Sequence, residues 1–156
     1  MKSRIYQSYL FMIAMIIFIS CSSSMDNEPV DTDHPARDSV AVVTCAYVSD
    51  GDTWNFYYSD KKYIVRVLHV DCFETREGER LNDQAEKAGI SPDSALKLGK
   101  AAKELAEVLL EDKQVTIVRD YSEYNKDVYD RLLRITIIDG KRLDSIMIAE
   151  GYGFPY

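Results

Sequence analysis

The stretch "VRVLHVDCFE", residues 65–74, joins a strand-like run to charges that a strand core seldom carries. Its β-branched and apolar residues predict a buried strand. Arg66 lies between two valines, and an arginine in apolar surroundings is rarely left without a partner. Arg66 and Asp71 are five residues apart, so strict alternation would place them on opposite faces of the strand. We therefore expect the chain to leave the strand before Asp71, so that Arg66, Asp71 and Glu74 can share one site.

The flanking sequence predicts a β-rich α+β domain. Turn residues such as the Asp139–Gly140 pair separate short β-branched runs, and Ser91 followed by proline marks the start of a long helix. Residues 75–90 are expected to form a charged loop. On the long helix, the expected apolar face consists of Ala101, Leu105, Val108 and Leu109. Strands are expected at 41–48, 53–58, 63–70, 114–119 and 132–138, and helices at 91–111 and 143–150. Five strands with a helix between the third and the fourth predict a five-stranded OB-fold barrel with helices packed on it.

The N-terminus predicts export. Lys2 and Arg4 precede an apolar run, residues 9–19, which is short for a mature membrane span and stops just before Cys21. A small residue and a cysteine after such a run resemble a bacterial lipoprotein signal, in which that cysteine becomes the acylated mature N-terminus. An ordinary signal peptide or an uncleaved anchor is the alternative. We predict a signal peptide at 1–20, a disordered Ser/Asp/Pro-rich tether at 21–40 and the folded domain at 41–156.

Charge and cysteine content limit the function classes. The net charge of the whole chain is −7, from 19 basic and 26 acidic residues. Proteins that bind nucleic acid through many phosphates are usually basic, so the sign argues against strong non-specific binding. Cys45 and Cys72 could pair in an exported protein, but two separate thiols are the favoured interpretation.

Several charged residues suggest phosphodiester chemistry. Asp52 and Asp71 provide hard oxygen ligands for a cation such as calcium, although either could simply cap its own turn. Arg66 and Arg131 offer the planar fork that matches phosphate oxygens, although Arg66 could serve a structural ion pair. Two arginines, a dication site and the spare carboxylate of Glu74 are the parts of a phosphodiester hydrolase.

The chain resembles the staphylococcal nuclease (thermonuclease) family. The matching segments are "DGDT" (50–53), "VRVLHVDCFE" (65–74), "LGKAAKELAEVLL" (98–110) and "DVYDRLLRITIIDGKRLDSIMIAEG" (127–151). The combination is specific, whereas each piece alone would be weak.

The resemblance implies the following roles. The carboxylates of Asp52 and Asp71 and the backbone carbonyl of Cys72 would bind Ca²⁺. Glu74 would act as general base, and Arg66 and Arg131 would hold the phosphate and stabilise its growing charge. Tyr129 would lie near the nucleotide. The implied activity is a calcium-dependent endonuclease that acts on DNA and RNA and leaves 3′-phosphate ends.

Other functions remain open at this point. One is a non-catalytic OB-fold module that binds nucleic acid or another ligand on the cell envelope, and another is a structural or adhesion lipoprotein. Location is expected to be the cell envelope, through a lipid anchor at Cys21. The aromatic end, Tyr152, Phe154 and Tyr156, is expected to close the core, with base stacking as the alternative. The sequence gives no indication of the oligomeric state.

Overall fold

The structure is a computed structural model, and it describes residues 34–156. The predicted signal peptide, Cys21 and most of the predicted tether lie outside the described residues. Of the helices in 34–156, none combines the length and the apolar character that a membrane span needs.

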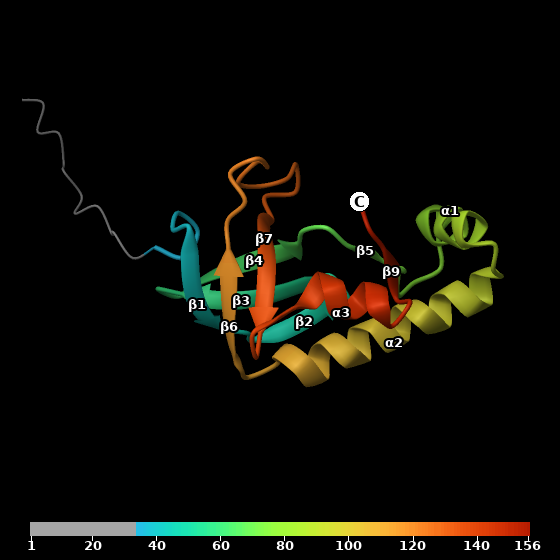
Figure 1. Cartoon of the computed structure of the whole chain (residues 1–156), viewed down its shortest axis with the longest axis horizontal. Helices are drawn as coiled ribbons and strands as arrows, with labels where there is room; N and C mark the ends of the chain where they lie inside the picture. The colour runs from blue at the N-terminus through green and yellow to red at the C-terminus, as the bar shows by residue number, and fades with distance from the viewer. Residues whose placement is uncertain (1–33) are drawn as a thin grey trace, which may run out of the picture. The chain divides into compact units, whose positions relative to one another are not determined.

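The main sheet is mixed, with strand order β1-β6-β7-β4-β3-β2 (Figure 1). The expected strand at 41–48 is two strands, because the chain changes partner at Cys45–Ala46: β1 pairs with β6, and β2 pairs with β3. The two strands at the ends of the order are therefore consecutive in the chain, as an OB-type fold requires. The hydrogen-bonded order itself is open, so closure into a barrel stays a prediction. The strands are β1 Val40–Thr44, β2 Tyr47–Asp50, β3 Thr53–Tyr58, β4 Lys61–Val67, β6 Gln114–Val118 and β7 Leu132–Ile138, with the short β8 Lys141–Arg142 beside β7.

Strand β4 begins and ends earlier than the predicted range 63–70. The β3–β4 hairpin turns on only Ser59 and Asp60, both with positive φ, so pairing resumes at Lys61. At its other end β4 stops at Val67, and His69 adopts a left-handed conformation with φ 67°. The expectation that the chain leaves the strand before Asp71 is confirmed.

The predicted loop at 75–90 is wrong, because most of it is helix α1, Glu79–Ala88. Leu81 and Ala85 lie one turn apart on this helix and are buried in a small cluster with Phe73 and Ala95. The many charged residues of α1 point elsewhere, and they hide this narrow apolar stripe in the sequence.

Helix α2, Pro92–Leu110, starts as predicted, with the Ser91 hydroxyl accepting from the amide of Ser94 at 3.2 Å. Its expected apolar face is confirmed for Leu105 and Leu109, which pack on the main core, and is wrong for Val108, which is 71% exposed. Small side chains face inward because the helix lies close to its neighbours. A Cβ at Gly99 would come within 2.2 Å of the Glu74 carbonyl oxygen. The buried residues of α2 are Ala95, Gly99, Ala102, Ala106 and Leu110.

The aromatic C-terminus mainly closes the core. After helix α3, Leu143–Ala149, strand β9 (Gly153–Phe154) pairs with β5 (Asp71–Cys72). The Phe154 ring lies 5.1 Å from that of Phe73, and Tyr152 packs on the main core. Strand β9 therefore holds in place the β5 segment that carries Asp71.

Contacts to the sheet begin before residue 41. Ala36 belongs to the main hydrophobic core, and its carbonyl accepts from the buried guanidinium of Arg134 at 2.9 Å. His34 Nε2 lies 2.8 Å from the Tyr63 hydroxyl. The last residues of the predicted tether thus pack on the domain, while its boundaries stay a prediction.

Candidate phosphodiester site

Asp52 is fixed between the start of β3 and the β5 segment. Its side chain is buried, with Oδ1 accepting from the Thr53 hydroxyl at 3.0 Å and Oδ2 accepting from the Cys72 amide at 2.9 Å. Gly51 allows α2 to approach, since a Cβ there would lie 2.8 Å from that of Ala102. Asp52 thus connects two segments 20 residues apart.

Arg66 joins the two carboxylates among the predicted cation ligands. Its Nη1 lies 3.1 Å from Asp52 Oδ2, and its Nη2 lies 3.1 Å from Asp71 Oδ1. Nη1 also donates to the carbonyls of Val67 and Val70, at 2.8 and 2.7 Å, which fixes the turn between β4 and β5. The turn therefore brings Arg66 and Asp71 together despite their odd spacing, and the structural ion pair considered for Arg66 is present.

Glu74 and Arg131 line one pocket of about 290 Å³. Strands β4 and β7 pair in parallel, with Arg66 opposite Leu133. Arg131, which directly precedes β7, therefore comes close to strand β4, which carries Arg66. The other lining residues are Ser49, Asp50, Thr53, Thr75 and Arg76. The pocket thus places a carboxylate and a guanidinium from distant segments around one small space.

Arg131 is held in place by its own loop. Its Nε donates to Asp127 Oδ2 at 2.6 Å, and Asp127 Oδ1 accepts from the amides of Tyr129 and Arg131. Burial opposes ionisation of Asp127, but these hydrogen bonds from Arg131 outweigh it and lower the pKa of the carboxyl. The Tyr129 side chain is 76% exposed, and its ring lies 5.4 Å from the Arg131 guanidinium. Tyr129 is therefore available beside the pocket, as the predicted nucleotide contact requires.

Two residues of α1 enter the site, and the sequence analysis missed both. Arg80 Nη2 lies 2.6 Å from Asp71 Oδ1, and its Nε lies 2.6 Å from Glu74 Oε1. The buried Gln84 donates to the Cys72 carbonyl at 2.8 Å and accepts from the Glu74 amide at 2.9 Å. They are four residues apart, so they lie on one face of a helix. Only recognition of α1 as a helix would have indicated them.

The carboxylates of the site are crowded. Burial, and next the negative charge of Asp52, raise the pKa of Asp50 to about 6. Burial also raises the pKa of Asp52, against the opposing charge of Arg66. Asp50 was part of the quoted "DGDT" motif but was not predicted as a site residue. Neighbouring carboxylates such as Asp50 and Asp52 favour the binding of a cation, because the cation neutralises their like charges.

The donor chemistry of the site fits calcium, although a finished cage is not present. Carboxylate and carbonyl oxygens from Asp52, Asp71 and Cys72 are the hard ligands that calcium prefers. Within residues 34–156, however, no three His, Cys, Asp or Glu side chains are placed together as a ready metal site. The three predicted ligands are engaged by Arg66, Arg80 and Gln84, so a cation would have to replace some of these donors.

Cys72 takes part in the site through its backbone. Its thiol is buried, and burial followed by the charge of Asp52 raises its pKa. Cys45 and Cys72 are both free thiols, which confirms the favoured interpretation.

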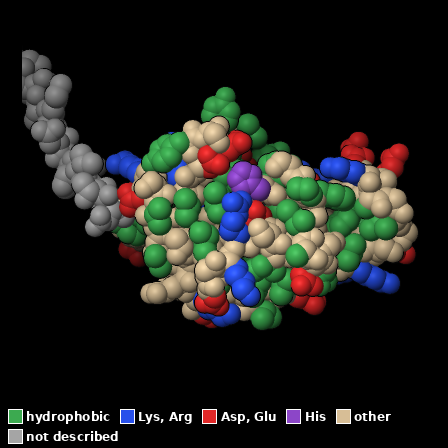
Figure 2. Space-filling model, in the orientation of Figure 1, with side chains coloured by type: hydrophobic (Ala, Val, Ile, Leu, Met, Phe, Trp, Pro, Cys, Tyr) green, Lys and Arg blue, Asp and Glu red, His purple; other side chains and the backbone are tan. Residues whose placement is uncertain are grey.

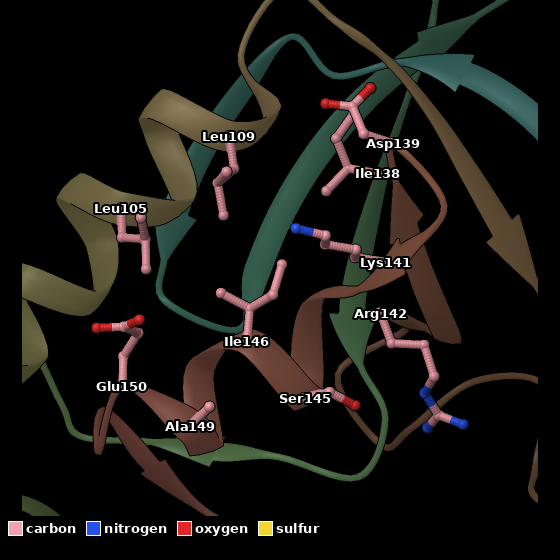
Figure 3. Close-up of a pocket in the computed structure, with 10 residues that line it drawn as sticks. All are labelled: Leu105, Leu109, Ile138, Asp139, Lys141, Arg142, Ser145, Ile146, Ala149 and Glu150. Atoms are coloured by element: carbon pink, nitrogen blue, oxygen red, sulfur yellow. The ribbon is translucent and has the colours of Figure 1, made fainter.

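Another pocket lies away from these residues. It has a volume of about 680 Å³ and opens between α2 and α3 (Figure 3). Leu105, Leu109 and Ile146 line its apolar part, while Lys141 and Arg142 provide charged groups. It contains none of the predicted site residues.

The strand order is that of an OB-type fold, and the site combines carboxylates with guanidinium groups. The family described as "Staphylococcal nuclease homologue" matches residues 64–156, and the chain belongs to this family. Membership supports a nuclease or nucleic-acid-binding role and confirms the resemblance drawn from the sequence. No curated protein matches the chain significantly.

Proposed function

We propose that the protein is a calcium-dependent phosphodiesterase, an endonuclease that hydrolyses DNA and RNA. One observation carries the proposal: Glu74 and Arg131 line the same pocket, next to the Asp52–Arg66–Asp71 cluster. Residues from four separate segments meet there. A general base, phosphate-binding cations and hard oxygen ligands are the groups that phosphodiester hydrolysis needs.

Each residue has a defined task in this proposal. Glu74 takes the proton from the attacking water. Arg131 presents its terminal nitrogens to the phosphate, because the ion pair with Asp127 uses Nε. Arg66 stabilises the negative charge that grows on the phosphate oxygens. Its guanidinium is preorganised by two backbone carbonyls, so little rearrangement is needed when the charge develops.

Asp52, Asp71 and the Cys72 carbonyl would hold Ca²⁺, with Asp50 as a nearby further carboxylate. When bound, the ion supplies Lewis-acid polarisation and orients the phosphate. The proposed direction of cleavage leaves a 3′-phosphate and a free 5′-hydroxyl.

The test is cleavage of heat-denatured DNA by the full-length protein in mild detergent, with calcium and then with excess chelator. We expect calcium-dependent cleavage that disappears in Glu74→Gln, which keeps the side-chain shape and removes the base. We also expect fragments that a polymerase extends only after phosphatase treatment, as 3′-phosphate ends require. Absence of cleavage by the folded protein would reject catalysis.

A non-catalytic nucleic-acid-binding module is the second candidate. It is favoured by the contact of Arg80 with Glu74, which engages the base candidate in the free protein. Binding of a single-stranded oligonucleotide without turnover at any calcium concentration would establish this role instead.

We further propose that the protein is exported and anchored to the cell envelope by a lipid on Cys21. The apolar run at 9–19 and the cysteine that follows it support this location. Labelling with a fatty-acid analogue is expected to mark the wild-type protein and not Cys21→Ala. Equal labelling of both proteins would reject the anchor.

A further inference from the structure

Arg80 binds two carboxylates of the site: Asp71, which the proposed function assigns to a divalent cation, and Glu74, which it assigns as the general base. Its two ion pairs, each 2.6 Å long, reach Asp71 Oδ1 and Glu74 Oε1 at the same time. The guanidinium is thus bound by the two carboxylates as a cation would be. Asp71 Oδ1 also receives Arg66 Nη2, so two positive groups converge on one oxygen.

The two arginines differ in how firmly they are held. Arg66 is buried, and two backbone carbonyls fix it. The Arg80 side chain is 61% exposed, and its guanidinium contacts the carboxylates of Asp71 and Glu74. An exposed guanidinium on a flexible stem can leave at little free-energy cost, because exposed ion pairs are weak and water takes over its hydrogen bonds.

Gln84, not Arg80, holds the backbone of this segment. It binds the Cys72 carbonyl and the Glu74 amide, so the ligand-bearing residues keep their position when Arg80 leaves. Arg80 therefore contributes a positive charge to the site, whereas Gln84 holds its backbone in position.

We propose that Arg80 is a built-in competitor for the divalent cation: it neutralises Asp71 and Glu74 in the free protein and gives them up when the cation binds. The inference rests on the proposed function, since it takes Asp71 as a cation ligand. Arg80 is here a residue that sets cation affinity, and its place on α1 makes that helix part of the site.

The test is a calorimetric calcium titration of the full-length protein in detergent, with calcium-induced change in melting temperature as a second readout. In Arg80→Ala we expect roughly three- to tenfold tighter calcium binding, the size that two partly exposed ion pairs support. Arg80→Lys is expected to fall between wild type and Arg80→Ala, because lysine keeps the charge but cannot bridge both carboxylates with a planar fork.

Arg76→Ala is the matched control. Arg76 also lines the pocket with Glu74, and within residues 34–156 no ion pair joins it to Asp71 or Glu74. Its removal deletes the same charge near the site, and we expect less than a twofold change in affinity.

The outcomes separate the inference from the function on which it rests. Unchanged or weaker calcium binding in Arg80→Ala, with the wild type still binding, overturns the competitor role and leaves the proposed calcium dependence standing. Equal gains in Arg76→Ala and Arg80→Ala also overturn it, because general charge would then explain both. If neither wild type nor Arg80→Ala binds calcium, the calcium part of the proposed function fails as well.

Discussion

At the scale of single residues, the two predicted phosphate ligands have different environments, so their removal should have different consequences. Arg66 neutralises the buried Asp52. Arg66→Ala leaves that charge unpaired and should destabilise the fold by about 3–5 kcal/mol. Arg131 pairs with Asp127 near the surface, so Arg131→Ala should lower the unfolding free energy by about 1 kcal/mol or less. Urea unfolding measures both changes.

Cleavage should fall in both variants, for one shared reason. In the proposed mechanism each variant loses a charged donor that faces the growing charge on phosphate, and such a loss costs on the order of 10²–10³ in rate. Rates are compared in the absence of urea, at a temperature at which both variants are shown to be folded. Cleavage within a few-fold of wild type in Arg131→Ala would remove this residue from the proposed mechanism.

Residue chemistry was predictable from the sequence where a motif carried it, and not elsewhere. The proximity of Arg66 and Asp71 was predicted from the loop-like sequence after the strand, against the alternation that their spacing implies, and the structure has it. Arg80 and Gln84 carry no motif, and they reach the site only because α1 folds back onto it. Long-range placement of this kind depends on packing that a local pattern does not encode.

At the scale of elements, the close contact between α2 and the Asp71–Glu74 segment depends on Gly99. Helix propensity alone predicts that Gly99→Ala gains up to about 1 kcal/mol. The structure predicts the opposite, because the new Cβ would lie 2.2 Å from the Glu74 backbone oxygen. We expect a loss of about 1–3 kcal/mol from overpacking, with displacement of Glu74 and reduced cleavage.

Gly78→Ala is the matched substitution for this test. A Cβ at Gly78 meets nothing within 4 Å, and the residue precedes α1 in an extended conformation. The unfolding free energy of the Gly78→Ala protein should differ from that of the wild type by about 1 kcal/mol or less. A Gly99→Ala variant that is as stable as Gly78→Ala would mean that α2 can move away without cost.

Elements with a strong local signal were predicted well, and those defined by packing were not. Strands β3 and β7 have the predicted bounds, 53–58 and 132–138, because β-branched and aromatic runs ended by turn residues leave little choice. The apolar face of α2 was predicted only in part, because burial there also depends on side-chain size. Leu105 and Leu109 pack on the core as predicted, but alanine and glycine face the closest neighbours, and Val108 points to solvent. Hydrophobic periodicity ranks residues by polarity and does not measure how near the neighbour lies.

At the scale of the whole molecule, the buried thiol of Cys45 couples global stability to alkaline pH. Burial, with the charge of Glu111, raises its pKa to about 12 in the folded protein. The unfolded chain loses this proton near pH 9, so the folded state holds more protons between these values, and stability falls as pH rises. At pH 10 the contribution amounts to roughly 1 kcal/mol.

The measurement compares urea unfolding of wild type and Cys45→Ala at pH 7 and pH 10. Other groups titrate in this range, but they do so in both proteins, so the difference between the two slopes isolates Cys45. The wild type should lose more stability than the variant. Parallel pH profiles would show that the thiolate is tolerated in the folded state.

The charge of the whole molecule sets how nucleic acid can be held. The chain carries a net charge of −7, and on the face in Figure 2 acidic and basic side chains are interspersed without a continuous basic stripe. In the proposed function, binding rests on a few local contacts, chiefly with Arg66 and Arg131, and on stacking with exposed rings such as Tyr129. Each phosphate contact to a single strand contributes about −0.7 to the slope of log K against log salt.

Two contacts therefore predict a slope of roughly −1 to −2, much shallower than that of a basic nucleic-acid-binding protein. The measurement is fluorescence anisotropy of a labelled single-stranded oligonucleotide with Glu74→Gln, at constant calcium and varied potassium chloride. Arg131→Ala added to this background should flatten the slope by about 0.7, because one phosphate contact is gone. Tyr129→Ala should weaken binding without changing the slope, because stacking releases no counterions. A slope steeper than about −4 would require many more phosphate contacts than these two arginines provide, and nucleic acid would then have to bind along a different surface.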